Sequence, residues 1–102
     1  MSVESMVSGD GQELTIQVSG RFDFSAHQAF RDAYETPASS GVRKFVVDLS
    51  GTSYLDSSAL GMLLLLRDHA GGDTAEVSIV NCNQDVKKIL AISNFEQLFA
   101  IQ

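Results

Sequence analysis

YLDSSALGMLLLLRDHAGG, residues 54–72, places an aspartate and two serines directly before a run of leucines and closes on a pair of glycines. Asp and Ser are favoured at helix N-caps because their side-chain oxygens accept hydrogen bonds from the free amides of the first turn. Glycine is favoured just beyond the last turn because it adopts positive φ without steric cost. The stretch therefore predicts a helix that opens at Asp56 and closes at Gly71-Gly72.

The apolar residues of this helix are too many for one buried face. At about 100° per residue, one side collects a sufficient core set, namely Ala59, Met62, Leu63, Leu66 and Ala70. The opposite side carries Ser57, Gly61, Leu64 and Asp68, with Leu65 nearby. If the helix covers one side of a sheet, Leu64 and Leu65 have no place in the core, and we expect them to form a docking surface.

Gly61 stands one turn into this helix, where it costs about 1 kcal/mol of helix propensity relative to alanine. We therefore expect Gly61 to have a role that offsets this cost. Two explanations are equally open from the sequence: close approach of another chain to the helix backbone, or tight packing within the protein itself.

The N-terminal region predicts an antiparallel hairpin. Val3–Val7 is a strand candidate, and Asp10-Gly11 is a turn signal. After the turn, Leu14, Ile16 and Val18 alternate with polar residues, which predicts the second strand.

A helix and a buried strand are predicted next. Ser25 and Gln28 have the spacing of a capping box, in which the two side chains satisfy each other's backbone amides. The apolar stripe of this helix consists of Ala26, Ala29, Phe30 and Ala33. Pro37 and Gly41 end the helical region, and Lys44–Leu49 is a short apolar run typical of a buried strand.

The chain beyond the leucine-rich helix predicts a strand, a helix and a last short strand. The strand is Glu76–Val80, and Asn83 or Asp85 caps the helix. The inward residues of that helix are Val86, Ile89 and Leu90, with Asn94 as its stop and Phe99–Ile101 as the last strand. Strands separated by helices require right-handed crossovers. The predicted fold class is α/β: one domain, residues 1–102, with about three helices and a mixed, mostly parallel sheet that begins with the antiparallel hairpin.

Composition and charge exclude several classes of function. A net charge of −6 argues against a nucleic-acid surface. Cys82 is the only cysteine, so the chain has no internal disulfide and no cysteine-based metal site. The opening MSVESMVSGDG lacks the basic and apolar regions of a signal peptide. The apolar run from Met62 to Leu66 is too short to cross a bilayer. We therefore expect a cytoplasmic protein without membrane insertion.

The sequence does not favour an enzyme. The best candidates would be Ser57 with His27 or His69, but the chain lacks a G-x-S-x-G nucleophile elbow. His69 falls in a last helical turn, where the helix dipole favours a cation and a surface role. The carboxylates have no metal-ligand spacing, and no glycine-rich phosphate cradle supports a nucleotide near Asp23. We expect no catalytic residue, cofactor or metal.

Ser57 and Ser58 are candidates for phosphorylation as well as capping. A phosphoserine adds about −1.5 to −2 charge at neutral pH. At a helix N-terminus that charge meets a favourable dipole, so the fold should survive the modification. A partner docked over the same spot would instead meet a bulky, solvated dianion. The expected outcome is a switch that blocks binding and leaves the protein folded.

The stretch VVDLSGTSYLDSSALG, residues 46–61, resembles the STAS family, in particular its stand-alone bacterial anti-sigma factor antagonists. GRFD, residues 20–23, is similar to the family's G-x-x-D after the second strand. The resemblance implies that Ser57 is the phosphate acceptor and Ser58 the weaker candidate. It also implies an anti-sigma factor or switch serine kinase, together with a serine phosphatase, as partners. The implied function is that the unphosphorylated form binds the anti-sigma factor and frees the sigma factor.

The docking residues predicted from the helix pattern and the resemblance are Asp23, Asp56, Ser57, Ser58, Gly61, Leu64, Leu65 and Asp68. Two departures from the family pattern are visible. Ala59 replaces a glycine found in many relatives, and the sequence stops at Gln102 where many relatives continue into a final helix. The second departure could leave a sheet edge open for homodimer pairing.

An alternative STAS function remains open. The family also contains constitutive subunits of lipid or anion transport complexes, in which the domain is structural and is not switched by phosphate. The exposed Leu64 and Leu65 would suit a permanent interface equally well. The retained Asp56-Ser57-Ser58 favours the switch.

Overall fold

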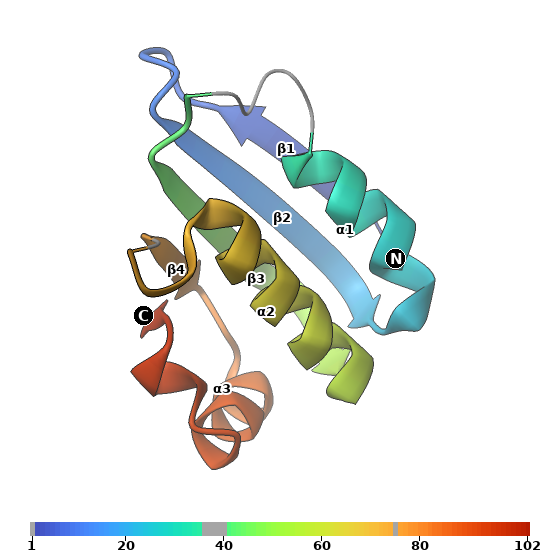
Figure 1. Cartoon of the computed structure of the whole chain (residues 1–102). Coiled ribbons are helices and arrows are strands. Elements are labelled where there is room, and N and C mark those ends of the chain that lie inside the picture. The colour runs from blue at the N-terminus through green and yellow to red at the C-terminus, as the bar shows by residue number, and fades with distance from the viewer. Residues whose placement is uncertain (1, 36–40, 75) are drawn as a thin grey trace.

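The structure is a computed structural model that describes residues 2–35, 41–74 and 76–102 (Figure 1). Its strands are β1 (Ser2–Val7), β2 (Glu13–Phe22), β3 (Lys44–Leu55), β4 (Val77–Val80) and β5 (Ala100–Ile101). Its α-helices are α1 (His27–Tyr34), α2 (Ser57–Ala70) and α3 (Gln84–Ile92). Short 3₁₀ turns are η1 (Phe24–Ala26), η3 (Gly72–Thr74) and η4 (Phe95–Gln97).

The strands form one sheet in the order β1-β2-β3-β4-β5. β1 and β2 pair antiparallel, and the remaining neighbours pair parallel. The predicted α/β fold, with its opening hairpin, mostly parallel sheet and three helices, is confirmed.

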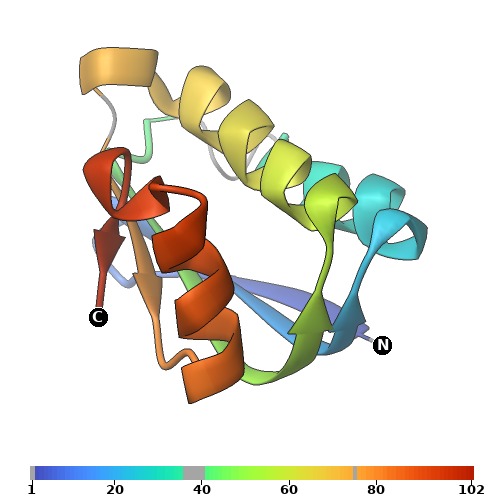
Figure 2. The ribbon, with the colours of Figure 1, turned by 90° about the horizontal axis from the view of Figure 1, so that it is seen from below.

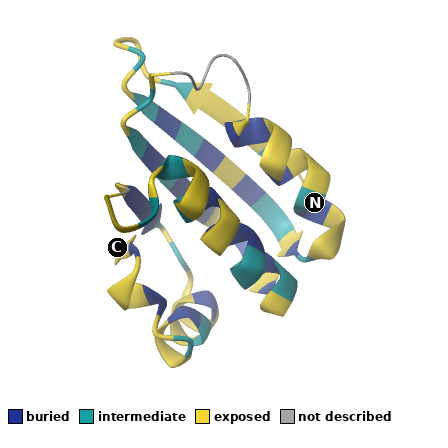
Figure 3. Ribbon diagram, in the orientation of Figure 1, coloured by how far each residue is buried: buried dark blue, intermediate teal, exposed yellow. Residues whose placement is uncertain are grey.

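The core lies between the helices and one face of the sheet. Alternation along β2 and β3 buries Leu14, Ile16, Val18, Phe45, Val47 and Leu49. The helices supply the facing side chains, among them Phe30 from α1, Leu63 and Leu66 from α2, and Val86 and Leu90 from α3. Figure 2 shows α1 and α2 together on one side of the sheet, and Figure 3 shows the buried stripes along the strands and helices. The predicted core face of α2 is therefore confirmed, with Ala70 at its half-buried end.

The predicted start of the first helix is wrong. Asp23, not Ser25, caps this segment: its Oδ1 accepts the Ser25 amide at 3.0 Å, and the turn η1 precedes α1. Gln28 does not reach back to a cap but donates to Asp32 Oδ1 at 2.8 Å. The short Asp23 carboxylate reaches the amide two residues ahead, which is the geometry of an Asx turn. Ala29, predicted to face the core, is exposed.

The first helix ends before Pro37 and Gly41, the residues predicted to end the helical region. α1 ends at Tyr34, where the amide of Glu35 bonds to the Arg31 carbonyl. Pro37 lies outside the described residues.

β3 is twice as long as the predicted strand Lys44–Leu49, because it continues to Leu55. Residues beyond Leu49, outside the predicted strand, also pair with β2, although two register shifts interrupt the ladder. Thr52 helps to hold this extension, since its buried hydroxyl donates to the Val18 carbonyl at 2.7 Å. The strand therefore leads directly into α2 and fixes where that helix begins.

The C-terminal elements follow the prediction closely. Asn83 is the cap of α3, with its Oδ1 accepting the Val86 amide at 2.8 Å. Its Nδ2 donates to the Thr52 carbonyl at 3.1 Å, which ties α3 to the extended part of β3. Asn94 adopts left-handed φ of 60° after α3, and β5 completes the parallel edge of the sheet.

Candidate functional site

The start of α2 is held by Asp56. Its backbone is extended (φ −117°, ψ −173°), and its Oδ1 accepts the Ala59 amide at 3.0 Å. The Asp56 amide donates to the Phe22 carbonyl at 3.4 Å, which joins the helix start to the end of β2. The aspartate of the Asp-Ser-Ser motif therefore performs the capping that the fold requires.

Ser57 is the first residue of α2, and its side chain is exposed, whereas Ser58 is half-buried. Within residues 2–35, 41–74 and 76–102, the structure shows no hydrogen bond from the Ser57 hydroxyl. Of the two hydroxyls, that of Ser57 is the more accessible to another protein.

The outer side of α2 carries two exposed leucines: Leu64 is 38 % and Leu65 50 % exposed. A Cβ built on Gly61 would meet no atom within 4 Å, so tight internal packing does not explain this glycine. The open space over the Gly61 backbone is compatible with close approach of another chain. Asp68 is also exposed, but eleven residues of helix place it about 16 Å along the axis from Ser57.

The carboxyl end of β2 lies beside the start of α2. In the parallel register, Arg21 pairs with Tyr54 and Phe22 with Leu55. The Arg21 guanidinium lies 4.3 Å from the centre of the Tyr54 ring, and its Nε is 3.8 Å from Asp23 Oδ2. Hydrogen bonds from the Ser25 hydroxyl and amide, with Arg21 nearby, lower the pKa of Asp23. The GRFD segment and the Asp-Ser-Ser motif are thus neighbours.

Two exposed aromatic residues at this end of the sheet were not among the predicted site residues. Phe24 is 70 % exposed and stacks on His27, with 5.4 Å between ring centres, and Tyr54 is 40 % exposed. Tyr54 could have been found by strand alternation, because it precedes the buried Leu55. The predicted strand ended at Leu49, whereas β3 continues to Leu55. Phe24 sits in a 3₁₀ turn, for which no periodic pattern existed.

Two of the candidate catalytic side chains, those of His69 and Cys82, are not placed for catalysis with Ser57. His69 packs against the rings of Tyr34 and Phe45, at 5.0 Å and 6.2 Å between centres. Twelve helical residues separate His69 from Ser57, a rise of about 18 Å. Cys82 is half-buried, and burial raises its pKa, which disfavours a reactive thiolate. No group of three His, Cys, Asp or Glu side chains in the described ranges could hold a metal ion.

The described helices are also too short or too polar to cross a membrane.

The fold and this motif define the class of protein: the chain belongs to the STAS-domain family. The family model described as "Mlab, STAS domain" matches residues 5–100. The STAS-domain containing protein PA14_20770 of Pseudomonas aeruginosa (strain UCBPP-PA14) is 66 % identical over 101 residues, which cover 99 % of each chain. The predicted family membership is confirmed.

Solved structures share the fold at low sequence identity. The anti-sigma factor antagonist SpoIIAA in its unphosphorylated form superposes with a TM-score of 0.75 at 16 % identity, covering 99 % of this chain and 87 % of that chain. An anti-sigma factor antagonist from Mycobacterium paratuberculosis gives 0.76 at 19 % identity, covering 98 % and 85 %. The murine Solute Carrier 26 family member A9 anion transporter gives 0.69 at 18 % identity, covering 87 % of this chain but 16 % of the transporter. The same fold thus occurs in small antagonists and within a transporter.

Proposed function

We propose that this protein is an anti-sigma factor antagonist that works by phosphorylation-gated partner switching. The unphosphorylated form binds an anti-sigma factor or switch serine kinase and thereby releases the sigma factor. Phosphorylation of Ser57 blocks that binding, and a serine phosphatase restores it. The role is one of binding and not of catalysis, and its setting is the cytoplasm.

The observation that carries this proposal is the division of roles between Asp56 and Ser57. A serine at a helix start is usually explained by capping, but here the Asp56 carboxylate bonds to the Ala59 amide. Ser57 is left exposed, and its hydroxyl makes no hydrogen bond within the described residues. It is therefore free to accept a phosphate without loss of a contact that holds the helix.

The electrostatics of the site favour a switch of binding over a switch of folding. A dianionic phosphate at the first residue of α2 faces the positive end of the helix dipole, worth about 0.3–1 kcal/mol at an exposed site. The folded state is thus not penalised. A partner that covers Ser57 would have to desolvate the phosphate, which is costly unless cations replace the water.

The proposed docking surface follows the outer side of α2 and continues onto the end of β2. Its residues are Asp23, Asp56, Ser57, Ser58, Gly61, Leu64, Leu65 and Asp68. The exposed leucines supply apolar area, and the open backbone at Gly61 permits close approach. Protein interfaces concentrate their binding energy in a few central, well-packed side chains. We therefore assign the main contribution to Leu64 and Leu65.

A second candidate is a constitutive STAS subunit of a lipid or anion transport complex. Its support is the same fold inside an anion transporter. The exposed leucines of α2 would then contact a transport subunit permanently, and Ser57 would remain unmodified.

Intact mass spectrometry of the protein purified from its native cell separates the two proposals. We expect a population heavier by one phosphate, present in the wild type and in Ser58→Ala but absent in Ser57→Ala. Ser58→Ala is the matched control, since it removes the neighbouring hydroxyl of the same motif. A protein that carries no phosphate under any growth condition would favour the transport subunit.

A further inference from the structure

The face of the sheet turned away from the helices carries an ordered array of side chains. Cross-strand register places Glu4 beside Gln17 and Gln17 beside Asp48, so these three form one row across β1, β2 and β3. The adjacent row consists of Met6, Thr15 and Val46. Neighbouring strands lie about 4.8 Å apart, so the two carboxylate residues are separated by roughly 10 Å of backbone with a neutral amide between them.

This face is not covered by the described helices. The buried side chains of β2 and β3 all belong to the other face, and Figure 2 shows α1 and α2 on that other side. On the open face Met6 is 73 % exposed, and Val46 is half-buried between its neighbours. A shallow hollow of about 240 Å³ lies there, lined by Glu4, Ser5, Met6, Thr15, Gln17 and Asp48. An exposed methionine beside half-buried apolar residues supplies contact area for another molecule.

The chemistry of the hollow selects a cation with an aliphatic stem. Among the described residues that line it, the charged ones are Glu4 and Asp48, and none is a Lys or Arg. The Asp48 carboxylate accepts the Ser50 amide at 2.9 Å, which fixes its orientation. An arginine or lysine could lay its methylene chain on Met6 and Thr15 and place its charged head over Gln17 between the two carboxylates.

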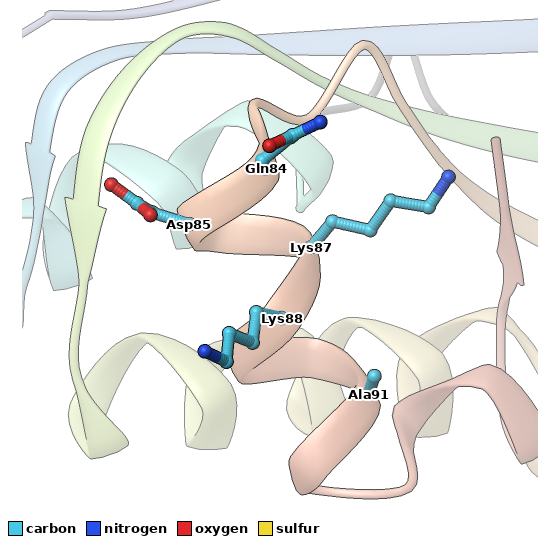
Figure 4. Close-up of a pocket in the computed structure, with 5 residues that line it drawn as sticks. All are labelled: Gln84, Asp85, Lys87, Lys88 and Ala91. Carbon is cyan, nitrogen blue, oxygen red and sulfur yellow. The ribbon is translucent and has the colours of Figure 1, made fainter.

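The larger hollow, beside α3, does not bring side chains of one charge together from different elements. It has a volume of about 410 Å³ and is lined by Gln84, Asp85, Lys87, Lys88 and Ala91, all from one helix. Figure 4 shows the side chains of Lys87 and Lys88 pointing in different directions along α3. Asp85 further dilutes the positive charge, so this hollow does not form a site for an anion.

We propose that the open face centred on Glu4, Gln17 and Asp48 is a second docking surface, and that its occupant is an arginine- or lysine-bearing segment of a partner protein. The surface is built from β1, β2 and β3 and does not include Ser57 or α2. This surface therefore binds its partner in either phosphorylation state of Ser57. The proposal thus goes beyond the phosphorylation switch at α2. A partner could remain attached here while the α2 surface is released.

The test is an NMR titration of the ¹⁵N-labelled full chain with the peptide acetyl-Gly-Arg-Gly-Arg-Gly-amide. The same peptide with citrulline in place of arginine is the probe control, because citrulline keeps the shape and removes the charge. We expect saturable shifts confined to the amides of residues 4–6, 15–17 and 46–48. The double variant Glu4→Gln and Asp48→Asn should bind the peptide about tenfold more weakly, since both charge-assisted contacts are lost.

Asp85→Asn is the matched variant control, because it removes one exposed carboxylate on α3. Asp85→Asn should leave the peptide titration unchanged. Ser57→Ala should leave it unchanged as well, so that a failure of the second docking surface can be distinguished from a failure of the phosphorylation switch. Equal binding of the citrulline peptide, shifts spread evenly over all acidic residues, or undiminished binding by the double variant would each overturn the proposal. The amide spectrum of each variant before titration verifies its fold.

Discussion

Asp56 Oδ1 accepts the amide of Ala59 at 3.0 Å, and this bond fixes the start of the helix that carries Ser57. The helix cap and the proposed phosphate acceptor are therefore different residues in one motif. This separation would allow the proposed switch residue, Ser57, to change its charge while the helix keeps its N-terminal hydrogen bond.

Asp56→Ala should lower the free energy of unfolding by about 0.5–2 kcal/mol, the usual loss when an N-cap is removed. Ser57→Ala should change it by less than about 0.5 kcal/mol, because an exposed serine without a hydrogen bond contributes little. Urea unfolding followed by circular dichroism measures both. Equal destabilisation by the two variants would mean that Ser57 shares the capping role.

Leu64→Asp and Leu65→Asp should weaken binding of the anti-sigma factor about tenfold or more, since each places a charge at the centre of the proposed apolar contact. Both residues are exposed, so the fold should be retained. Leu63→Ala is the contrasting variant. It removes a fully buried side chain of the same helix and should cost about 2–5 kcal/mol of stability. Calorimetric titration measures the affinity of each variant for the anti-sigma factor, and unfolding experiments measure its stability. Unaltered affinity in both aspartate variants would show that α2 is not part of the interface.

Thr52→Val should destabilise the protein by about 1–3 kcal/mol despite its similar size. The threonine hydroxyl is buried and donates to the Val18 carbonyl at 2.7 Å, and valine leaves that carbonyl without its donor. Thr52→Ser keeps the hydroxyl and should lose less stability. Thermal unfolding of the two variants gives the comparison, and a valine variant as stable as wild type would contradict the assigned role of this bond.

Asp23 should contribute to the acid sensitivity of the fold. Hydrogen bonds from Ser25 lower its pKa in the folded state, so it binds a proton more readily when unfolded. Its stabilising contribution is present above the unfolded pKa of about 3.9 and is lost as the pH falls through the lower folded value. Asp23→Asn should therefore lose less stability than wild type between about pH 6 and pH 3. The measurement is the free energy of unfolding as a function of pH, and curves that run parallel for wild type and Asp23→Asn would contradict this linkage.

The sequence predicted most of the fold because its turn and cap residues agree with its apolar periodicity. Asp56, Gly71 and Asn83 bound their helices where such residues should, and the two exposed leucines were identified from helix geometry alone. The errors fall where local signals compete. Ser25 and Gln28 have the spacing of a capping box, in which the Gln28 side chain would accept the Ser25 amide. In the structure Asp23 accepts that amide instead, through a tighter turn.

The extension of β3 was missed for a different reason. Gly51 has low strand propensity, and the pairing of this segment depends on β2 and on the buried Thr52 hydroxyl. Because the predicted strand ended at Leu49, the exposure of Tyr54 and its contact with Arg21 were not predicted either. The open sheet face could not be predicted either, since Glu4, Gln17 and Asp48 come together only through the strand register.

The central claim is tested most directly by comparing the affinity of the anti-sigma factor for the unmodified protein and for protein stoichiometrically phosphorylated at Ser57. Thermal unfolding of both forms should be measured alongside. We predict that the phosphate weakens binding at least about 100-fold, as expected for a buried, unpaired dianion, while the melting temperature stays within a few degrees. Equal affinity of the two forms, or a phosphorylated protein that no longer folds, would contradict the account.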